Sequence, residues 1–414
     1  MLISNATLAD GRTVSVRLDG DRIGAVLDPG APADADPGRS LDATGYLLLP
    51  APAEPHAHLD KALTADRVPN PAGDLGGAVT AWLGHRATLD REDFLERATQ
   101  TALKAVGNGC TAIRTHVDVG EGVGTTAVEA ILQVKADLAD EVELQVVGLV
   151  GRPTTGTAGA PNRHLLRRAL DLGLDVVGGC PHLDDDPAAS LAELLELASE
   201  YDRPVDLHTD ENLDPASVDL EALAHWVIDS GFERGVVASH CVSLGIQPTK
   251  IQERVAAAVA EAGVGVVTLP QTNLFLQARG QRTAPPRGLT ALASLLEAGV
   301  LVAAGADNVQ DPFCTVGRAD PLETASLLVM AGHLAPELAY DLVSNRARRA
   351  MGLVPVDMAP GSPAELLLVR AATVRQAVAD APPDRIVVHR GSVVARTEVR
   401  RSRPLRVGDQ APGA

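Results

Sequence analysis

Between residues 49 and 355 the chain repeats a single pattern, in which a short apolar strand is followed by a loop and an amphipathic helix. Such alternation is typical of a parallel sheet covered by helices, and eight repeats predict an α/β fold of the (β/α)8 TIM-type barrel. A doubly wound sheet is the alternative, but no Gly-x-Gly-x-x-Gly turn follows any early strand. After a first strand that ends at His58, we expect strands at residues 111–119, 143–150, 174–180, 204–208, 235–240, 263–269 and 300–305. Helices are expected at residues 91–106, 125–139, 187–201, 220–231, 250–263 and 290–298.

Both ends of the chain have β character instead. Alternating apolar residues and turn signals predict strands at residues 14–18, 23–27, 366–369 and 386–388. We expect residues 1–48 and 356–404 to pair into one small, discontinuous β-sandwich domain, with the barrel of residues 49–355 inserted between its halves. Residues 405–414 are rich in Pro and Gly and are expected to form a frayed tail.

The composition restricts the partners and the compartment. Lys and Arg number 36 and Asp and Glu 54, so the formal net charge is −18, which argues against nucleic acid or an anionic membrane as a partner. No apolar run reaches the roughly 18 residues of a membrane helix. The four cysteines are scattered without a Cys-x-x-Cys pair, as expected in the cytoplasm. A homo-oligomer is compatible with the sequence.

Polar residues recur where the predicted barrel strands end, which is where barrel enzymes place their chemistry. His56 and His58 are two residues apart, so on a strand they point to the same face. His208 ends the fifth strand, His240 the sixth, and Asp307 follows the eighth. Each has a simpler explanation, because a histidine can be a hydrogen-bonded core residue and an aspartate a helix cap. Together at one rim, they predict a site for a catalytic Zn²⁺ or Fe²⁺ ion.

The lysines of the chain favour one metal ion over two. A two-metal centre bridged by a carboxylated lysine needs a lysine at the end of the fourth strand, and residues 174–182 contain none. A metal of this kind lowers the pKa of a bound water toward 7. Glu211, three residues after His208, is our candidate for carrying a proton to the leaving nitrogen. Asp307 could orient the attacking water or accept its proton, and His240 could polarise it.

Several strings resemble the amidohydrolase superfamily, and specifically its cytosine deaminase branch, over nearly the whole chain. They are Glu-Pro-His-Ala-His-Leu-Asp at 54–60, Arg-Thr-His-Val-Asp-Val at 114–119, Asp-Leu-His-Thr-Asp-Glu at 206–211, Ala-Ser-His at 238–240, and Asp307. The resemblance implies one Zn²⁺ or Fe²⁺ ion with the ligands His56, His58, His208 and Asp307. It implies Glu211 as proton shuttle, His240 as partner of the attacking hydroxide, and release of ammonia from a small amino-substituted nitrogen heterocycle.

The departures from that family concern the substrate. Cytosine deaminases carry a glutamine after the third strand, and residues 147–153 contain none, so cytosine itself is not implied. Asn308 and Lys61 resemble the residues at the matching positions of N-isopropylammelide hydrolases. Those enzymes lack a glutamate at the position of Glu211, so Glu211 favours the deaminase branch. The candidates for substrate contacts are Asn308, Phe313, Gln277 and His182. Asn273 and Arg279, in the segment after the seventh strand, could also read polar edges of a substrate. His116 and Asp118 are expected to support the site without binding the metal.

Two other functions remain open at this point. The chain could hydrolyse an N-alkylated ring amine, which would release an alkylamine in place of ammonia. It could also bind a metal or ligand without turnover, although a binding site has no need of a proton-carrying glutamate such as Glu211.

Overall fold

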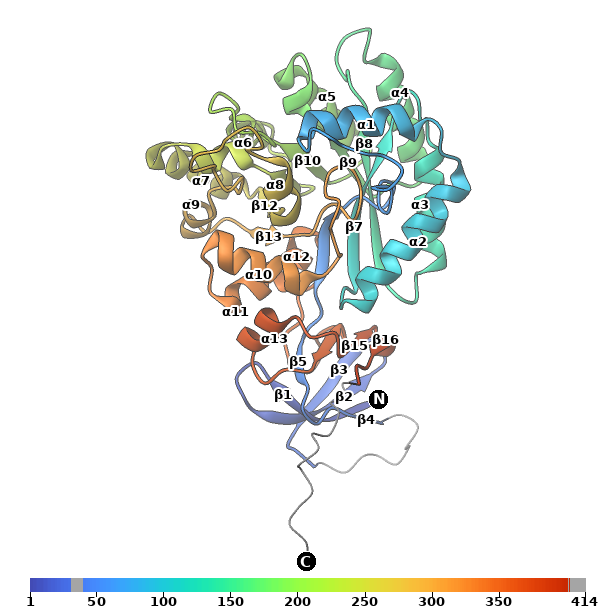
Figure 1. Cartoon of the computed structure of the whole chain (residues 1–414), viewed down its shortest axis with the longest axis vertical. Helices are drawn as coiled ribbons and strands as arrows, with labels where there is room; N and C mark the ends of the chain where they lie inside the picture. Colours follow the sequence, from blue (N-terminus) through green and yellow to red (C-terminus); the bar gives the residue numbers. More distant parts are fainter. Residues whose placement is uncertain (31–39, 401, 403–414) are drawn as a thin grey trace, which may run out of the picture.

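The computed structural model describes residues 1–30, 40–400 and 402. Its strands form two sheets of eight strands each, one parallel and one mixed. Figure 1 shows the parallel sheet and its helices at one end of the molecule, and the second sheet, which holds strands from both chain ends, at the other. The tail expected at residues 405–414 lies outside the described residues.

The parallel sheet is the predicted barrel. Its strands follow one another in chain order, each paired in parallel with the next. A parallel bridge between Ala57 and Asp307 joins the first strand to the segment after the last, which closes the ring. All eight predicted strands are present: β6 (Ala53–Ala57), β7 (Ala112–Val119), β8 (Glu143–Val150), β9 (Val176–Gly179), β10 (Val205–Thr209), β11 (Val236–His240), β12 (Gly265–Thr268) and β13 (Val302–Ala304).

Helices cover the outside of this ring (Figure 1). The six expected helices are α2 (Arg91–Gly107), α3 (Thr126–Asp137), α5 (Pro187–Glu200), α6 (Asp219–Ser230), α7 (Thr249–Ala262) and α9 (Leu292–Glu297). The other helices are α1 (Leu75–Arg86), α4 (Ala160–Asp171), α8 (Pro270–Leu276), α10 (Pro321–Gly332), α11 (Pro336–Leu342), α12 (Asn345–Ala350) and α13 (Val374–Asp380). None of the helices in the described part of the chain is long and apolar enough to cross a membrane.

The mixed sheet is built from both ends of the chain, as expected. Its order is β16-β15-β14-β5-β1-β2-β3, with β4 also paired to β1. The strands are β1 (Leu2–Leu8), β2 (Thr13–Asp19), β3 (Arg22–Leu27), β4 (Ser40–Asp42), β5 (Leu47–Pro50), β14 (Leu366–Val369), β15 (Arg385–His389) and β16 (Ser392–Thr397). Because side chains alternate along a strand, Leu48 of β5 packs into the core of this sheet, whereas Leu47 and Leu49 pack into the barrel core.

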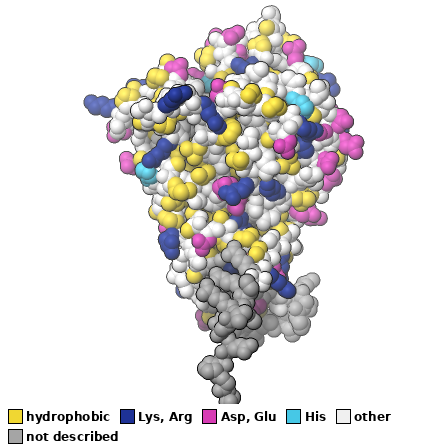
Figure 2. Space-filling view, in the orientation of Figure 1, with side chains coloured by type: hydrophobic (Ala, Val, Ile, Leu, Met, Phe, Trp, Pro, Cys, Tyr) yellow, Lys and Arg dark blue, Asp and Glu magenta, His cyan; other side chains and the backbone are white. Residues whose placement is uncertain are grey.

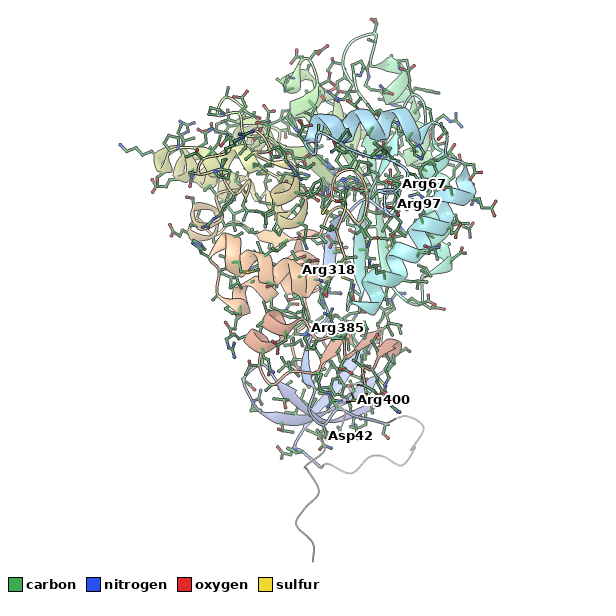
Figure 3. The ribbon with its side chains drawn as sticks, viewed as in Figure 1. Asp42, Arg67, Arg97, Arg318, Arg385 and Arg400 are labelled. Carbon is green, nitrogen blue, oxygen red and sulfur yellow. The ribbon has the colours of Figure 1, made fainter. Side chains whose placement is uncertain are left out.

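Arg385 of β15 fastens the mixed sheet to the barrel (Figure 3). Its guanidinium donates two hydrogen bonds, of 2.8 and 2.9 Å, to the carboxylate of Asp320, which caps the N-terminus of α10. A third, of 2.6 Å, reaches the carbonyl of Asn108, just after α2. This bidentate pair joins β15 to the N-terminus of α10 and to the end of α2.

Candidate metal centre and active site

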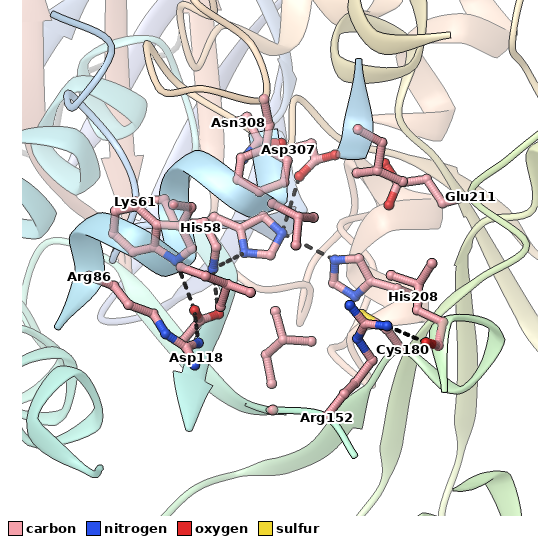
Figure 4. Close-up of a pocket in the computed structure, with 18 of the residues that line it drawn as sticks. His58, Lys61, Arg86, Asp118, Arg152, Cys180, His208, Glu211, Asp307 and Asn308 are labelled. Atoms are coloured by element: carbon pink, nitrogen blue, oxygen red, sulfur yellow. Dashed lines mark hydrogen bonds and ion pairs between the residues drawn. The ribbon is translucent and has the colours of Figure 1, made fainter. Parts of the chain in front are cut away.

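Four side chains converge at the carboxyl ends of the barrel strands, as the sequence predicted, and Figure 4 shows three of them, His58, His208 and Asp307. His58 Nε2 lies 3.2 Å from His208 Nε2 and 3.4 Å from Asp307 Oδ1. His56 Nε2 lies 3.8 Å from the same Asp307 oxygen. Ligand atoms that bind one ion at about 2.0–2.2 Å are separated by distances of this order. His56, His58 and Asp307 therefore lie close enough to hold one metal ion, and His208 Nε2 lies beside them, next to His58.

The protonation and pairing of these groups fit a metal ion. Burial, followed by the positive charge of neighbouring groups, holds the pKa of His56, His58 and His208 well below the usual value, so the rings are neutral. Neutral imidazole is the form that binds metals. His56 Nε2 and both carboxylate oxygens of Asp307 are buried with no hydrogen-bond partner among the described residues. Buried polar atoms normally have a partner, and a cation would supply one here.

A relay of hydrogen bonds orients His56. Its Nδ1 lies 2.8 Å from Ser239 Oγ, and Ser239 in turn donates to Asp206 at 3.0 Å. Arg114 donates to the other oxygen of Asp206 at 2.8 Å. His56 Nδ1 must therefore carry the hydrogen, which leaves Nε2 free to bind a metal. Asp206 and Ser239 belong to the strings that resemble the amidohydrolase superfamily, but no role was expected for either residue from the sequence. Their place on β10 and β11, with side chains pointing into the barrel, is the signal that identifies them.

Glu54 fixes the two ends of the ring against one another. Its carboxylate accepts from the backbone N–H of His56 at 3.1 Å and from that of Ala306 at 2.9 Å. Burial raises the pKa of Glu54 to about 8. Because it bridges β6 to the residue before Asp307, Glu54 sets the distance between a histidine and the carboxylate of the candidate site.

His116 of β7 lies directly behind the proposed ligands. Its ring stacks on that of His56, with centroids 3.9 Å apart. Together with His56 and His208 it forms a second group whose nitrogens lie close enough to hold a metal, besides the group of His56, His58 and Asp307. His116 Nε2 also lies 3.6 Å from Asp206, which places it among the supporting groups of the relay.

Glu211 and His240 stand beside the candidate metal position. Burial raises the pKa of Glu211 to about 8, which suits a group that must both take and give a proton near neutral pH. Asn273 Oδ1 lies 3.1 Å from His240 Nδ1, and the Asn273 amide oxygen can only accept. This contact fixes the hydrogen on Nδ1, so the unpartnered His240 Nε2 is an acceptor. Asn273, considered above as a substrate contact, is in α8 and positions His240.

A buried cluster of charged residues forms the wall opposite Glu211 (Figure 4). Lys61 Nζ donates to Asp118 Oδ1 at 2.7 Å and to Asp60 at 3.2 Å. Asp118 Oδ2 accepts from Arg86 at 2.6 Å and from the indole N–H of Trp82 at 2.8 Å. Although burial opposes it, Lys61 and Arg86 lower the pKa of Asp118. Arg86 and Trp82 come from α1, a helix that the sequence pattern did not predict.

A cavity of about 190 Å³ opens onto these groups. Asn308 and Phe313 line it, whereas Gln277 and His182 do not. Gln277 donates to the Glu211 carbonyl at 3.3 Å, and His182 Nδ1 lies 3.0 Å from the His208 carbonyl. The remaining wall is mostly apolar and is formed by Leu75, Val79, Trp82, Leu83, Leu149, Val150 and Leu183.

The outer surface gives no sign of a polyanionic partner on the face shown in Figure 2. Basic and acidic side chains are interspersed there among apolar ones.

Proteins that are similar to this chain over most of its length include two deaminases and an N-isopropylammelide hydrolase. A pterin deaminase of Rhizobium rhizogenes (strain K84) is 32% identical over 358 residues, which are 85% of this chain and 81% of that protein. The 5-methylcytosine deaminase of Klebsiella pneumoniae, liganded with 5-fluorocytosine, has a TM-score of 0.88 and 31% identity over 98% of this chain and 99% of that one. N-isopropylammelide isopropylaminohydrolase of Burkholderia multivorans has a TM-score of 0.82 and 29% identity, with 95% and 98% covered.

The expected resemblance is confirmed by these relatives and by a family model. Residues 63–397 match the model of the amidohydrolase family. That range holds seven of the eight barrel strands with His208, Glu211, His240 and Asp307. The chain is a member of the amidohydrolase family.

Proposed function

We propose that the protein is a metal-dependent hydrolytic deaminase of a small amino-substituted nitrogen heterocycle. The observation that carries this proposal is the convergence of His56, His58, His208 and Asp307 at one rim, with His240 Nε2 3.9 Å from Asp307 Oδ2 and Glu211 beside the His240 ring. Two relatives that are more than 30% identical carry the names pterin deaminase and 5-methylcytosine deaminase, which supports deamination of a ring.

His56, His58, His208 and Asp307 would hold one Zn²⁺ or Fe²⁺ ion, since imidazole and carboxylate ligands suit both. When bound, such an ion is a Lewis acid that lowers the pKa of a water toward 7. Measurement of the metal content of the purified protein distinguishes the two ions.

The residues of the chain then carry the protons. Glu211 takes a proton from the attacking water as its oxygen bonds to the ring carbon, and delivers it to the exocyclic amino group, which leaves as ammonia. His240 Nε2 accepts a hydrogen bond from the same water and orients it, because Asn273 keeps the hydrogen of His240 on Nδ1. The remaining hydrogen of the water passes from the new oxygen to the adjacent ring nitrogen, so that one ring amine and one water give one ring carbonyl and one ammonia.

An ammonia-release screen of the metal-reconstituted protein tests the proposal. The rings to include are aminopyrimidines, aminotriazines and pterins, with metal quantified per chain. Ammonia from one ring class, with about one metal per chain, is the expected result. The absence of any metal would overturn the ligand set. Release of an alkylamine from an N-alkylated ring would favour the second candidate, which the similarity to the Burkholderia multivorans hydrolase supports.

A further inference from the structure

Lys61 is a buried cation in the wall of the catalytic cavity. Only 4% of it is exposed, and it lines the cavity together with His58, Asp118, Asn308 and Phe313. Burying an ammonium group is costly unless its hydrogens are paired. The pairing of its three hydrogens therefore decides what this residue can do.

Two of those hydrogens are taken by carboxylates. Asp118 Oδ1 lies 2.7 Å from Lys61 Nζ, and Asp60 Oδ2 lies 3.2 Å from it. Asp118 is itself held by Arg86 and Trp82 through its other oxygen. The ammonium group is thus fixed in position before any substrate arrives.

Within the described chain, the only other group at hydrogen-bond distance from Lys61 Nζ is His58 Nδ1, at 3.3 Å. That nitrogen also lies 3.2 Å from the carbonyl of His116. With His58 Nε2 directed at Asp307 and His208, a metal-binding His58 must carry its hydrogen on Nδ1 and donate it to His116. Two donors cannot satisfy one another, so the third Lys61 hydrogen is left for the cavity.

The charge around Lys61 indicates the chemistry of the acceptor. Lys61 and Arg86 contribute two positive charges, and Asp60 and Asp118 two negative charges, so the cluster is already neutral. A neutral acceptor oxygen completes it without adding charge, and the guanidinium of Arg152, which also lines the cavity, donates to the carbonyl of Leu183. A ring carbonyl is such an acceptor, and the indole of Trp82, whose ring centroid is 5.6 Å from Nζ, offers a flat apolar surface beside it.

We propose that Lys61 is a specificity-determining residue that donates a hydrogen bond to a carbonyl oxygen of the substrate ring, so that the enzyme selects aminolactams over aminated rings without an oxo group. This rests on the proposed deaminase function. Lys61 would then recognise the polar edge of the substrate ring in a cavity that lacks the glutamine of cytosine deaminases.

The test compares ring pairs that differ only in the oxo group, cytosine with 4-aminopyrimidine and pterin with 2-aminopteridine, in the metal-loaded wild type, in Lys61→Met and in Lys250→Met. Lys250 is exposed on α7 and serves as the matched control. A hydrogen bond to a charged group contributes about 1.5–3 kcal/mol. For the ring class that is turned over, we therefore expect Lys61→Met to lower kcat/KM roughly 10- to 100-fold for the oxo ring and only slightly for the other. Equal losses for both rings would show a purely structural lysine and overturn the proposal.

Binding measurements separate this proposal from the deaminase function. Calorimetric titration of the wild type and both variants with 2-hydroxypyrimidine and with pyrimidine needs no turnover. Tighter binding of the oxo ring that depends on Lys61 supports the role of Lys61 even where no ring releases ammonia. Equal binding of the two rings by the wild type would exclude it, including where Lys61→Met does not fold.

Discussion

His58 Nε2 and His208 Nε2 face one another at 3.2 Å, from the ends of strands β6 and β10, with Asp307 Oδ1 3.4 Å from the first of them. Two neutral imidazole nitrogens at this distance share either a hydrogen or a metal ion. The carboxylate beside them favours the ion, because an unpaired buried carboxylate is costly. The stability of the protein should therefore depend on metal.

Removal of the metal with a chelator should lower the melting temperature. At a metal concentration about 100 times Kd, binding stabilises the folded state by about 2.7 kcal/mol, which for a chain of 414 residues corresponds to a shift of roughly 3 °C. Scanning calorimetry before chelation, after it and after readdition of Zn²⁺ or Fe²⁺ measures the effect. A His58→Ala variant should show no such dependence, and an unchanged wild type would argue against the site.

Ser239→Ala should weaken metal binding without removing a ligand. The substitution deletes the oxygen that accepts from His56 Nδ1, so the imidazole loses its orientation. Loss of such a supporting contact typically lowers metal affinity about 10- to 100-fold. Competition with a chromogenic chelator measures Kd for the variant and for Ser294→Ala, a serine on α9 whose hydroxyl donates to Gln252 on α7. Identical affinities of Ser239→Ala and wild type would show that the relay does not act on the metal.

The barrel could be predicted from the sequence because each of its strands is a short apolar run with its own turn signals. The convergence of His56, His58, His208 and Asp307 followed from the rule that chemistry lies at the carboxyl ends of such strands. These are properties of single segments and of their order, which a sequence displays directly.

The charged wall of the cavity could not be predicted in this way, because α1 does not resemble a helix in sequence. Three of its residues are glycines, and each costs about 1 kcal/mol relative to alanine. What holds α1 is tertiary: Asp74 caps its first turn, and Trp82 and Arg86 bond to Asp118 on β7. The role of Asn273 could not be predicted either, because its contact with His240 joins residues that are 33 positions apart in the sequence.

Glu211→Gln should abolish most turnover and leave the metal in place. Glutamine keeps the size of the side chain but cannot take or give the proton, so kcat should fall roughly 10²-fold or more. Steady-state ammonia release with metal analysis of the same sample measures both quantities. Glu253→Gln, on the exposed side of α7, is the matched control. Full activity of Glu211→Gln would remove Glu211 from the mechanism.

The raised pKa of Glu211 also predicts how the stability of the metal-free protein changes with pH. Burial raises this pKa from 4.5 to about 8, so between these values the folded state holds a proton that the unfolded state has lost. The contribution of Glu211 to stability is therefore complete below pH 4.5 and is lost progressively as the pH rises to about 8. Glutamine does not titrate, so the melting temperature of chelated Glu211→Gln should rise relative to wild type from pH 5 to pH 8. Glu253→Gln should track the wild type throughout, and a constant difference between Glu211→Gln and wild type would mean that Glu211 is already ionised in the folded, metal-free state.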